Sequence, residues 1–186
     1  DGNFPTVISP YPEEGEALSE AIALGESINA DLVMGTDPDA DRVGIAIPNP
    51  EGEYVLLNGN QTGSLLVNYL ILRWQELGKI TGNEFVAKTI VTTDLIDAIA
   101  TANKVKVYNT LTGFKHIGAT IKKLEGQERF IGGGEESYGY LSGDFVRDKD
   151  AVMSCALIAE IVAWAKSSGK TLFNLMEEMY IEHGFY

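Results

Sequence analysis

The fold is decided by residues 85–134, which read FVAKTIVTTDLIDAIATANKVKVYNTLTGFKHIGATIKKLEGQERFIGGG. Short apolar runs typical of strands alternate in this stretch with segments whose apolar residues recur at a helical period. The pattern predicts three strands, over Phe85–Thr92, Val105–Leu111 and Arg129–Gly132. It predicts two helices between them, one capped by Asp94 and ending at Ala102, the other spanning Phe114–Leu124. This order indicates an α/β fold of three layers, with a doubly wound and mostly parallel sheet.

Further helices flank this stretch on both sides. Thr62–Leu77 is strongly apolar and predicts a helix, with Gly78 placed to cap its C-terminus. Two more helices are expected near Asp150–Lys166 and Thr171–His183. We therefore assign residues 58–186 to one α/β domain.

Residues 1–57 carry fewer strands than an independent sheet requires. We expect a helix over Glu13–Ile28, with Leu18, Ile22 and Ile28 on its inner side. The expected strands are Phe4–Ser9, Leu32–Met34 and a hairpin of Val43–Ile47 with Tyr54–Leu57. These elements predict a partial α/β domain, the end of a unit that begins earlier in the polypeptide.

The composition argues against several classes of protein. The 186 residues hold 14 Lys and Arg against 27 Asp and Glu, a net charge of −13, whereas a nucleic-acid partner requires a basic face. The single cysteine, Cys155, excludes an internal disulfide. No apolar run reaches the roughly 20 residues of a membrane span, and the first residues lack the features of a secretory leader. We expect a cytoplasmic protein with neither nucleic acid nor membrane as a partner.

One loop at the end of a predicted strand carries three aspartates. It reads Asp37-Pro38-Asp39-Ala40-Asp41-Arg42, and we call it the acidic loop. Carboxylates at alternating positions of a tight loop are suited to one hard divalent cation, although a solvated acidic turn is the alternative. An EF-hand is excluded, because its sixth and twelfth positions require Gly and Glu and are here Arg42 and Pro48. Arg42 is suited to neutralise a phosphate beside the metal.

Two other loops follow predicted strands, where ligands bind in an open parallel sheet. Leu111-Thr112-Gly113-Phe114-Lys115 opens a helix whose N-terminus favours an anion, although a plain turn explains it equally well. The glutamate loop is Gly132-Gly133-Gly134-Glu135-Glu136-Ser137-Tyr138-Gly139. Its carboxylates and hydroxyl are suited to sugar hydroxyls, with a metal site or a solvated turn as alternatives. We expect its glycines to turn sharply at positive φ and its carboxylates to be largely exposed.

Four motifs, in this order, resemble the phosphoglucomutase/phosphomannomutase branch of the α-D-phosphohexomutase superfamily. They are Asp37–Arg42, Thr112–Lys115, Gly134–Gly139 and Arg147–Asp150, and the similarity runs through almost the whole chain. The resemblance implies an enzyme of four domains around one cleft that uses Mg²⁺ and interconverts 1-phospho and 6-phospho sugars. It implies a phosphoserine in the first domain and a bisphosphorylated intermediate that returns a phosphate to it.

The resemblance also implies roles for individual residues. Asp37, Asp39 and Asp41 would hold the Mg²⁺, Arg42 would lie against the transferring phosphate, and Lys149 matches a lysine near the reacting hydroxyl. The remaining matches would be substrate contacts on two loops. Thr112, Gly113 and Lys115 lie on one. On the other, Glu135 or Glu136 would act with Ser137; the alignment favours Glu135 and Ser137, and which glutamate makes the main sugar contact stays open.

The resemblance further indicates what the chain lacks. The serine-bearing loop and the domain that clamps the nonreacting phosphate have no counterpart in the sequence. Residues 1–57 would be the end of domain 2 and residues 58–186 domain 3, with domains 1 and 4 and a sugar phosphate as partners. Phosphoryl transfer depends on positioning and charge stabilisation, so the isolated chain is expected to be inactive. The preferred sugar stays open among glucose, mannose, glucosamine and a pentose.

Two rival functions use the same loops. A non-catalytic module that binds a metal or a sugar phosphate is the first. A phosphatase with Asp37 as its nucleophile is the second, but the Thr that commonly follows such a motif is replaced by Asp41.

Overall fold

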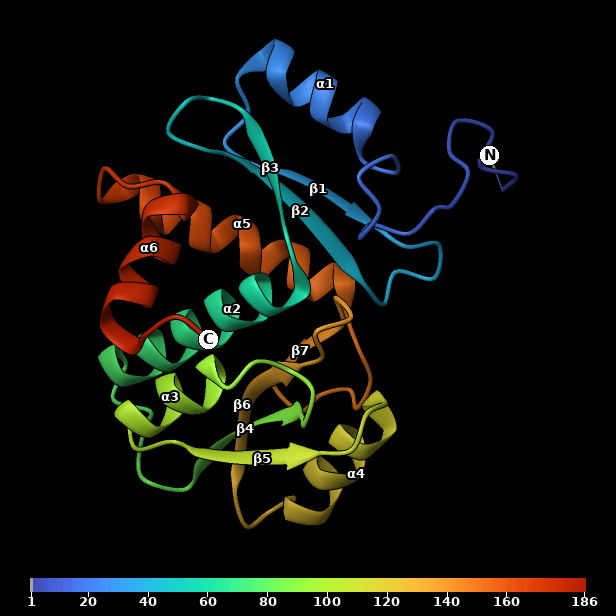
Figure 1. The fold of residues 1–186 in the computed structure, drawn as a ribbon. Coiled ribbons are helices and arrows are strands. Elements are labelled where there is room, and N and C mark those ends of the chain that lie inside the picture. The colour runs from blue at the N-terminus through green and yellow to red at the C-terminus, as the bar shows by residue number, and fades with distance from the viewer. Residues whose placement is uncertain (1) are drawn as a thin grey trace.

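The larger of two sheets has the strand order β5-β4-β6-β7 in the computed structural model, which describes residues 2–186 (Figure 1). Its strands are β4 (Glu84–Thr89), β5 (Lys106–Thr110), β6 (Arg129–Gly134) and β7 (Tyr140–Ser142). The central β4 pairs in parallel with β5 and β6, while β7 is antiparallel to β6. The predicted, mostly parallel α/β sheet is confirmed. The antiparallel β7 is not predicted, because three residues are too few to show a strand period.

Helices cover both faces of this sheet and make it the middle of three layers. On one face, Phe85 and Phe130 pack with Ile117 of α4 (Phe114–Leu124). On the other face, Val86 and Ile131 share a larger core with four helices. These are α2 (Gly59–Glu76), α3 (Leu95–Ala102), α5 (Ala151–Ser167) and α6 (Leu172–His183). The alternation of neighbouring residues between two cores is what the pleat of a sheet buried on both faces requires.

The first part of the chain forms a separate antiparallel sheet beside α1 (Ser19–Ile28), so the expectation that it holds too few strands for an independent sheet is wrong. Its strands, in the order β1-β2-β3, are β1 (Val33–Thr36), β2 (Val43–Pro48) and β3 (Tyr54–Leu57). The predicted hairpin of β2 and β3 is confirmed. Val43, Ile45 and Ile47 of β2 belong to the same core as α2 and α5, which lie between the two sheets (Figure 1). The small sheet is therefore fixed against the larger α/β unit.

Several local predictions are wrong. Phe4–Ser9 forms turns instead of a strand, since Pro5 has no N–H to donate and the prolines that follow break the extended pattern. The first helix begins at Ser19, because residues 11–18 form successive turns, and Ile28 is exposed on it. The strand β4 ends at Thr89, where a turn begins in which Thr92 N–H donates to the Thr89 carbonyl.

The two predicted helix caps, at Gly78 and Asp94, differ in outcome. Gly78 follows α2 at φ 64° and its N–H donates to the Gln75 carbonyl, as predicted. Asp150 and Thr171 cap α5 and α6 through their side chains. Asp94 occupies the N-cap of α3 but makes no capping hydrogen bond; its carboxylate lies 3.6 Å from Lys88 Nζ instead. No single helix among residues 2–186 is long and apolar enough to cross a membrane; only α5 and α6 together pass that test, as a bent pair.

Candidate functional site

The acidic loop is organised by its first aspartate. Asp37 follows β1 and is 3% exposed. Its Oδ1 accepts hydrogen bonds from the backbone N–H groups of Asp41 and Arg42, each at 3.0 Å. Ala40, at φ 56°, closes the turn between them, and its N–H donates to the Asp37 carbonyl. This turn brings the carboxylates of Asp37, Asp39 and Asp41 together.

The three carboxylates fit the donor set of a divalent cation. One oxygen from each of Asp37, Asp39 and Asp41 lies within 4.8 Å of the others. Asp37 is buried, Asp41 is half-buried and Asp39 is exposed, so the group opens to solvent on the side of Asp39. Hard cations such as Mg²⁺ prefer such oxygen ligands. The expected convergence of the three aspartates is therefore present in the structure.

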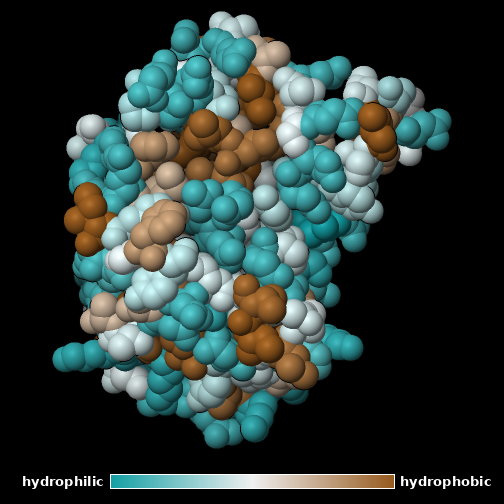
Figure 2. Space-filling model, viewed as in Figure 1, coloured by the Kyte–Doolittle hydropathy of each residue, from teal (hydrophilic) through white to brown (hydrophobic). Residues whose placement is uncertain are grey.

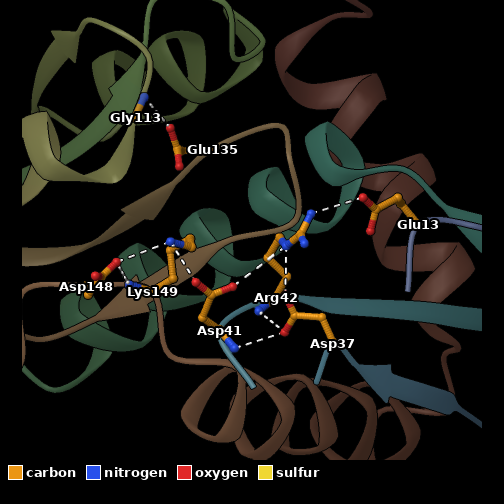
Figure 3. A network of polar contacts seen from close by, with 8 residues as sticks. All are labelled: Glu13, Asp37, Asp41, Arg42, Gly113, Glu135, Asp148 and Lys149. Carbon is orange, nitrogen blue, oxygen red and sulfur yellow. Dashed lines mark hydrogen bonds and ion pairs between the residues drawn. The ribbon is translucent and has the colours of Figure 1, made fainter. Parts of the chain in front are cut away.

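The side chain of Arg42 turns back onto the aspartates of its own loop and forms an ion-pair network with them (Figure 3). Its Nε is 2.8 Å from Asp37 Oδ2, and its guanidinium reaches Glu13 Oε1 at 3.1 Å and stacks over the ring of Tyr11. Burial would raise the pKa of Asp37, but hydrogen bonds from Arg42 and Asp41 outweigh it and lower that pKa. Glu13 and Tyr11 are site neighbours that sequence reasoning missed, since neither belongs to a motif.

Lys149 reaches the same group of carboxylates from the loop before α5. Its Nζ lies 2.8 Å from Asp41 Oδ2 and 3.3 Å from Asp148, and it sits above the ring of Phe114. Burial raises the pKa of Asp41 and Asp37 adds to this effect, whereas Lys149 acts in the opposite direction. A cation is thus held beside the third carboxylate.

Backbone contacts join the acidic loop to the glutamate loop. Arg42 and Gly139 form an antiparallel bridge, and Val43 N–H donates to the Tyr138 carbonyl at 3.1 Å. Lys149 packs so closely on Gly139 that a Cβ there would lie 2.2 Å from its Cδ. The two predicted loops, far apart in the sequence, therefore lie in direct contact.

Glu135 is buried, so the prediction of largely exposed carboxylates is wrong for this residue. It is 7% exposed, and its Oε1 accepts the backbone N–H of Gly113 at 2.8 Å (Figure 3). Gly113 is the N-cap of α4 at φ 103°, a conformation that favours glycine. The contact ties the second predicted loop to the third, while Thr112 and Lys115 remain exposed beside it.

The remaining glutamate-loop residues differ from one another in exposure. Glu136 is half-buried and Ser137 is exposed. Gly132, Gly133 and Gly134 are buried in β6, none of them at positive φ, so the expected sharp turn is wrong there; Tyr138 turns at φ 70° instead. A Cβ on Gly133 would lie 1.9 Å from the Ala87 carbonyl oxygen. The glycines therefore serve close strand packing.

Two further residues named from the sequence are held by protein partners. Arg147, which begins the fourth motif, pairs with Glu125 at 2.6 Å. Both carboxylate oxygens of Asp37 accept hydrogen bonds and the side chain is almost fully buried. Such a group is poorly placed to attack a phosphate, which argues against the phosphatase.

Models of one protein family match most of the chain. Models for the phosphoglucomutase/phosphomannomutase family match residues 1–52 (alpha/beta/alpha domain II) and residues 58–182 (alpha/beta/alpha domain III). A phosphoglucomutase of Staphylococcus aureus strain N315 is 42% identical over 180 residues, which are 97% of this chain and 32% of that protein. The chain thus spans about a third of the length of this curated relative.

Solved structures show the same fold. A putative phosphomannomutase from Thermus thermophilus has a TM-score of 0.74 at 25% identity, over 93% of this chain and 36% of its own. A phosphoglucomutase/phosphomannomutase family protein from Burkholderia thailandensis has a TM-score of 0.73 at 20% identity, over 96% of this chain and 35% of its own. On the family-model matches and the 42% identity, the chain belongs to the phosphoglucomutase/phosphomannomutase family of α-D-phosphohexomutases.

Proposed function

We propose that this chain forms part of a Mg²⁺-dependent phosphohexose mutase. The enzyme would interconvert hexose 1-phosphate and hexose 6-phosphate through a phosphoserine and a bisphosphorylated intermediate, as the family resemblance implies. One observation carries the proposal: three aspartate oxygens lie within 4.8 Å of one another, with Lys149 and Arg42 paired to the same carboxylates. A metal site flanked by cations suits the transfer of a phosphoryl group between anionic oxygens.

The charged residues of the acidic loop and Lys149 have distinct parts in this proposal. Asp37, Asp39 and Asp41 would hold the Mg²⁺, which supplies Lewis-acid polarisation of the phosphoryl oxygens when bound. Arg42 would add positive charge beside the transferring phosphate. Lys149 would face the reacting hydroxyl and hold or release its proton, with Asp41 as the neighbouring carboxylate.

The two other loops would bind the substrate. Ser137 and Thr112 are exposed and would donate to or accept from sugar hydroxyls, while Lys115 would attract the anionic sugar phosphate. Glu135 would act with Gly113, whose backbone it already binds. Glu136 would bind the sugar through its carboxylate. The preferred hexose would depend on the contacts that the two loops make together.

We further propose that residues 1–57 are the end of domain 2, that residues 58–186 are domain 3, and that the enzyme acts in the cytoplasm. Domains 1 and 4 would supply the catalytic serine and the clamp for the nonreacting phosphate. The surface of the small sheet supports this division. Figure 2 shows apolar side chains gathered between α1 and this sheet, and Leu24, Ile28 and Leu56 of these elements are exposed. Without the catalytic serine and the phosphate clamp of the other domains, the isolated chain would not convert its substrate.

The experiment requires the full-length enzyme that carries this segment. Conversion of glucose 1-phosphate to glucose 6-phosphate is followed with Mg²⁺, with EDTA, and in the Asp39→Asn variant. Asp31→Asn is the matched control, because within residues 2–186 this exposed aspartate pairs with Lys166 alone. We expect turnover that EDTA abolishes, that Asp39→Asn lowers about 10²-fold or more, and that Asp31→Asn leaves unchanged. Binding of Mg²⁺ and sugar phosphate without isomerisation would instead favour the non-catalytic module.

A further inference from the structure

The guanidinium of Arg42 is held by the protein at two nitrogens and on one face. Its Nε donates to Asp37 Oδ2 at 2.8 Å and its Nη1 donates to Glu13 Oε1 at 3.1 Å. Its central carbon lies 4.9 Å from the centre of the Tyr11 ring. Within residues 2–186, Nη2 makes no hydrogen bond, so one nitrogen of the planar fork is left for an anion (Figure 3).

The two outer contacts come from a turn that packs directly on β2. Tyr11 and Glu13 flank Pro12, which is buried and whose ring fixes the backbone φ between them. A Cβ on Gly44 would lie 2.0 Å from the Pro12 carbonyl oxygen, so only glycine lets the turn approach the strand this closely. Gly44 lies two residues after Arg42, and the turn is thereby fixed beside the arginine.

The burial of Glu13 is unusual for an ion pair near the surface. Its side chain is 30% exposed, and within the described residues its Oε2 is buried and has no hydrogen-bond partner. A buried oxygen without a partner costs free energy, and a partly buried ion pair is weak evidence for stability. Stability alone therefore explains this carboxylate poorly, whereas a role in holding Arg42 accounts for its position.

We propose that Tyr11 and Glu13 are positioning residues that hold the Arg42 guanidinium with its Nη2 directed to the transferring phosphate. The proposal rests on the place of Arg42 beside that phosphate in the proposed function. Tyr11 and Glu13 would not touch the substrate; they act through the arginine. By fixing a long and flexible side chain before the phosphate arrives, they reduce the rotamer freedom that is lost on binding.

The test is a double-mutant cycle in the full-length enzyme, with glucose 1-phosphate as the substrate. Glu13→Ala removes the carboxylate and Glu13→Gln keeps an acceptor of the same shape. Tyr11→Leu removes the aromatic ring and Tyr11→Phe keeps it. Glu13→Ala and Tyr11→Leu are also made in an Arg42→Ala background. Glu14→Ala is the matched control, because this glutamate is exposed on the same turn.

We expect Glu13→Ala to lower kcat about 10- to 50-fold with a smaller change in KM, because a misplaced Arg42 stabilises the transferring phosphate less well. Glu13→Gln should restore part of the loss. Tyr11→Leu should lower kcat about 2- to 5-fold, and Tyr11→Phe should retain most of the wild-type value. Glu14→Ala should match the wild type.

In the Arg42→Ala background, neither Glu13→Ala nor Tyr11→Leu should lower kcat further. An equal loss from Glu13→Ala in both backgrounds would show a merely structural role and overturn the proposal. If Glu13→Ala does not fold, Glu13→Gln and Tyr11→Leu carry the same comparison.

Two outcomes separate this inference from the proposed function. If the enzyme isomerises the sugar phosphate and Arg42→Ala leaves kcat unchanged, Arg42 does not act on the phosphate, and the positioning role is wrong while the function stands. If the enzyme does not isomerise the sugar phosphate at all, equilibrium binding of glucose 1-phosphate with Mg²⁺ replaces kcat in the same cycle. A loss of affinity on Glu13→Ala that is absent in the Arg42→Ala background then supports the positioning role, and unchanged affinity or additive losses contradict it.

Discussion

Lys149 Nζ lies 2.8 Å from Asp41 Oδ2, which joins the loop before α5 to the third carboxylate of the acidic loop. The ammonium is thus paired with one of the three carboxylates that would hold a divalent cation. The two cations would compete for Asp41, so this ion pair links metal affinity to the placement of Lys149. Both side chains are partly shielded from solvent, which limits screening by salt.

Removal of this ammonium should separate metal binding from turnover. In Lys149→Met, we expect divalent-cation affinity to rise about 2- to 5-fold, because Asp41 loses a competing cation. Turnover by the full-length enzyme should fall about 10²-fold or more, because no group would hold the hydroxyl proton. Titration with Mn²⁺ monitored by its paramagnetic signal, together with a mutase assay, checks both. Weaker metal binding in this variant would contradict the competition.

Asp37 and Asp39 should differ in their effect on stability. Asp37→Asn disturbs hydrogen bonds to the backbone of Asp41 and Arg42 and to the Arg42 guanidinium, and should cost about 1.5–3 kcal/mol of unfolding free energy. Asp39→Asn should change it by less than about 0.5 kcal/mol, because that side chain is exposed. Urea denaturation of the 186-residue chain without metal measures both. Equal losses in the two variants would show that Asp37 does not organise the loop.

The sequence predicts best where a pattern is local and repeated. The helix Phe114–Leu124 has the predicted bounds, because a glycine N-cap precedes it and its apolar residues keep a helical period. The three aspartates converge as expected, since spacing within one tight loop fixes their separation. Both predictions depend on residues close together in the chain.

Contacts between distant segments could not be predicted in the same way. The burial of Glu135 depends on the backbone N–H of Gly113, which lies in another loop and carries no side-chain signal. The role of Gly133 depends on the Ala87 carbonyl oxygen of the neighbouring strand. Phe4–Ser9 has strand-like residues, but no strand among residues 2–186 pairs with it. Each of these outcomes was decided by packing that a linear pattern does not contain.

A buried carboxylate far from the acidic loop should dominate the acid sensitivity of the chain. Burial would raise the pKa of Glu84, but hydrogen bonds from Arg129, Thr81 and Gly82 outweigh it and lower that pKa to about 2. The folded pKa lies below the ordinary value of 4.5, so this stabilisation is present above pH 4.5 and is lost as the pH falls toward 2. The full loss would be about 3 kcal/mol.

Glu84→Gln should remove most of this pH dependence. Unfolding free energies measured between pH 7 and pH 3 should converge for the two proteins as the pH falls, because the wild-type chain loses what the variant already lacks. Glu51→Gln, at an exposed position of the β2–β3 loop, is the control and should follow the wild type. A constant difference between wild type and Glu84→Gln across this range would show that the ionised carboxylate is not the source of the stability.

Gly139→Ala should displace Lys149 while leaving the chain folded. The added Cβ would lie 2.2 Å from Lys149 Cδ and 2.8 Å from its Cγ, and those atoms belong to a flexible side chain that can move. We expect a loss of about 1–3 kcal/mol in unfolding free energy and a fall in turnover of the full-length enzyme toward that of Lys149→Ala. In Gly133→Ala the Cβ meets the Ala87 carbonyl oxygen at 1.9 Å, where the backbone cannot yield, so this control should be far less stable. In a Lys149→Ala background, Gly139→Ala should lower turnover no further, since the atoms it would displace are gone. An additional loss there would mean that Gly139 acts on the site by some route other than Lys149.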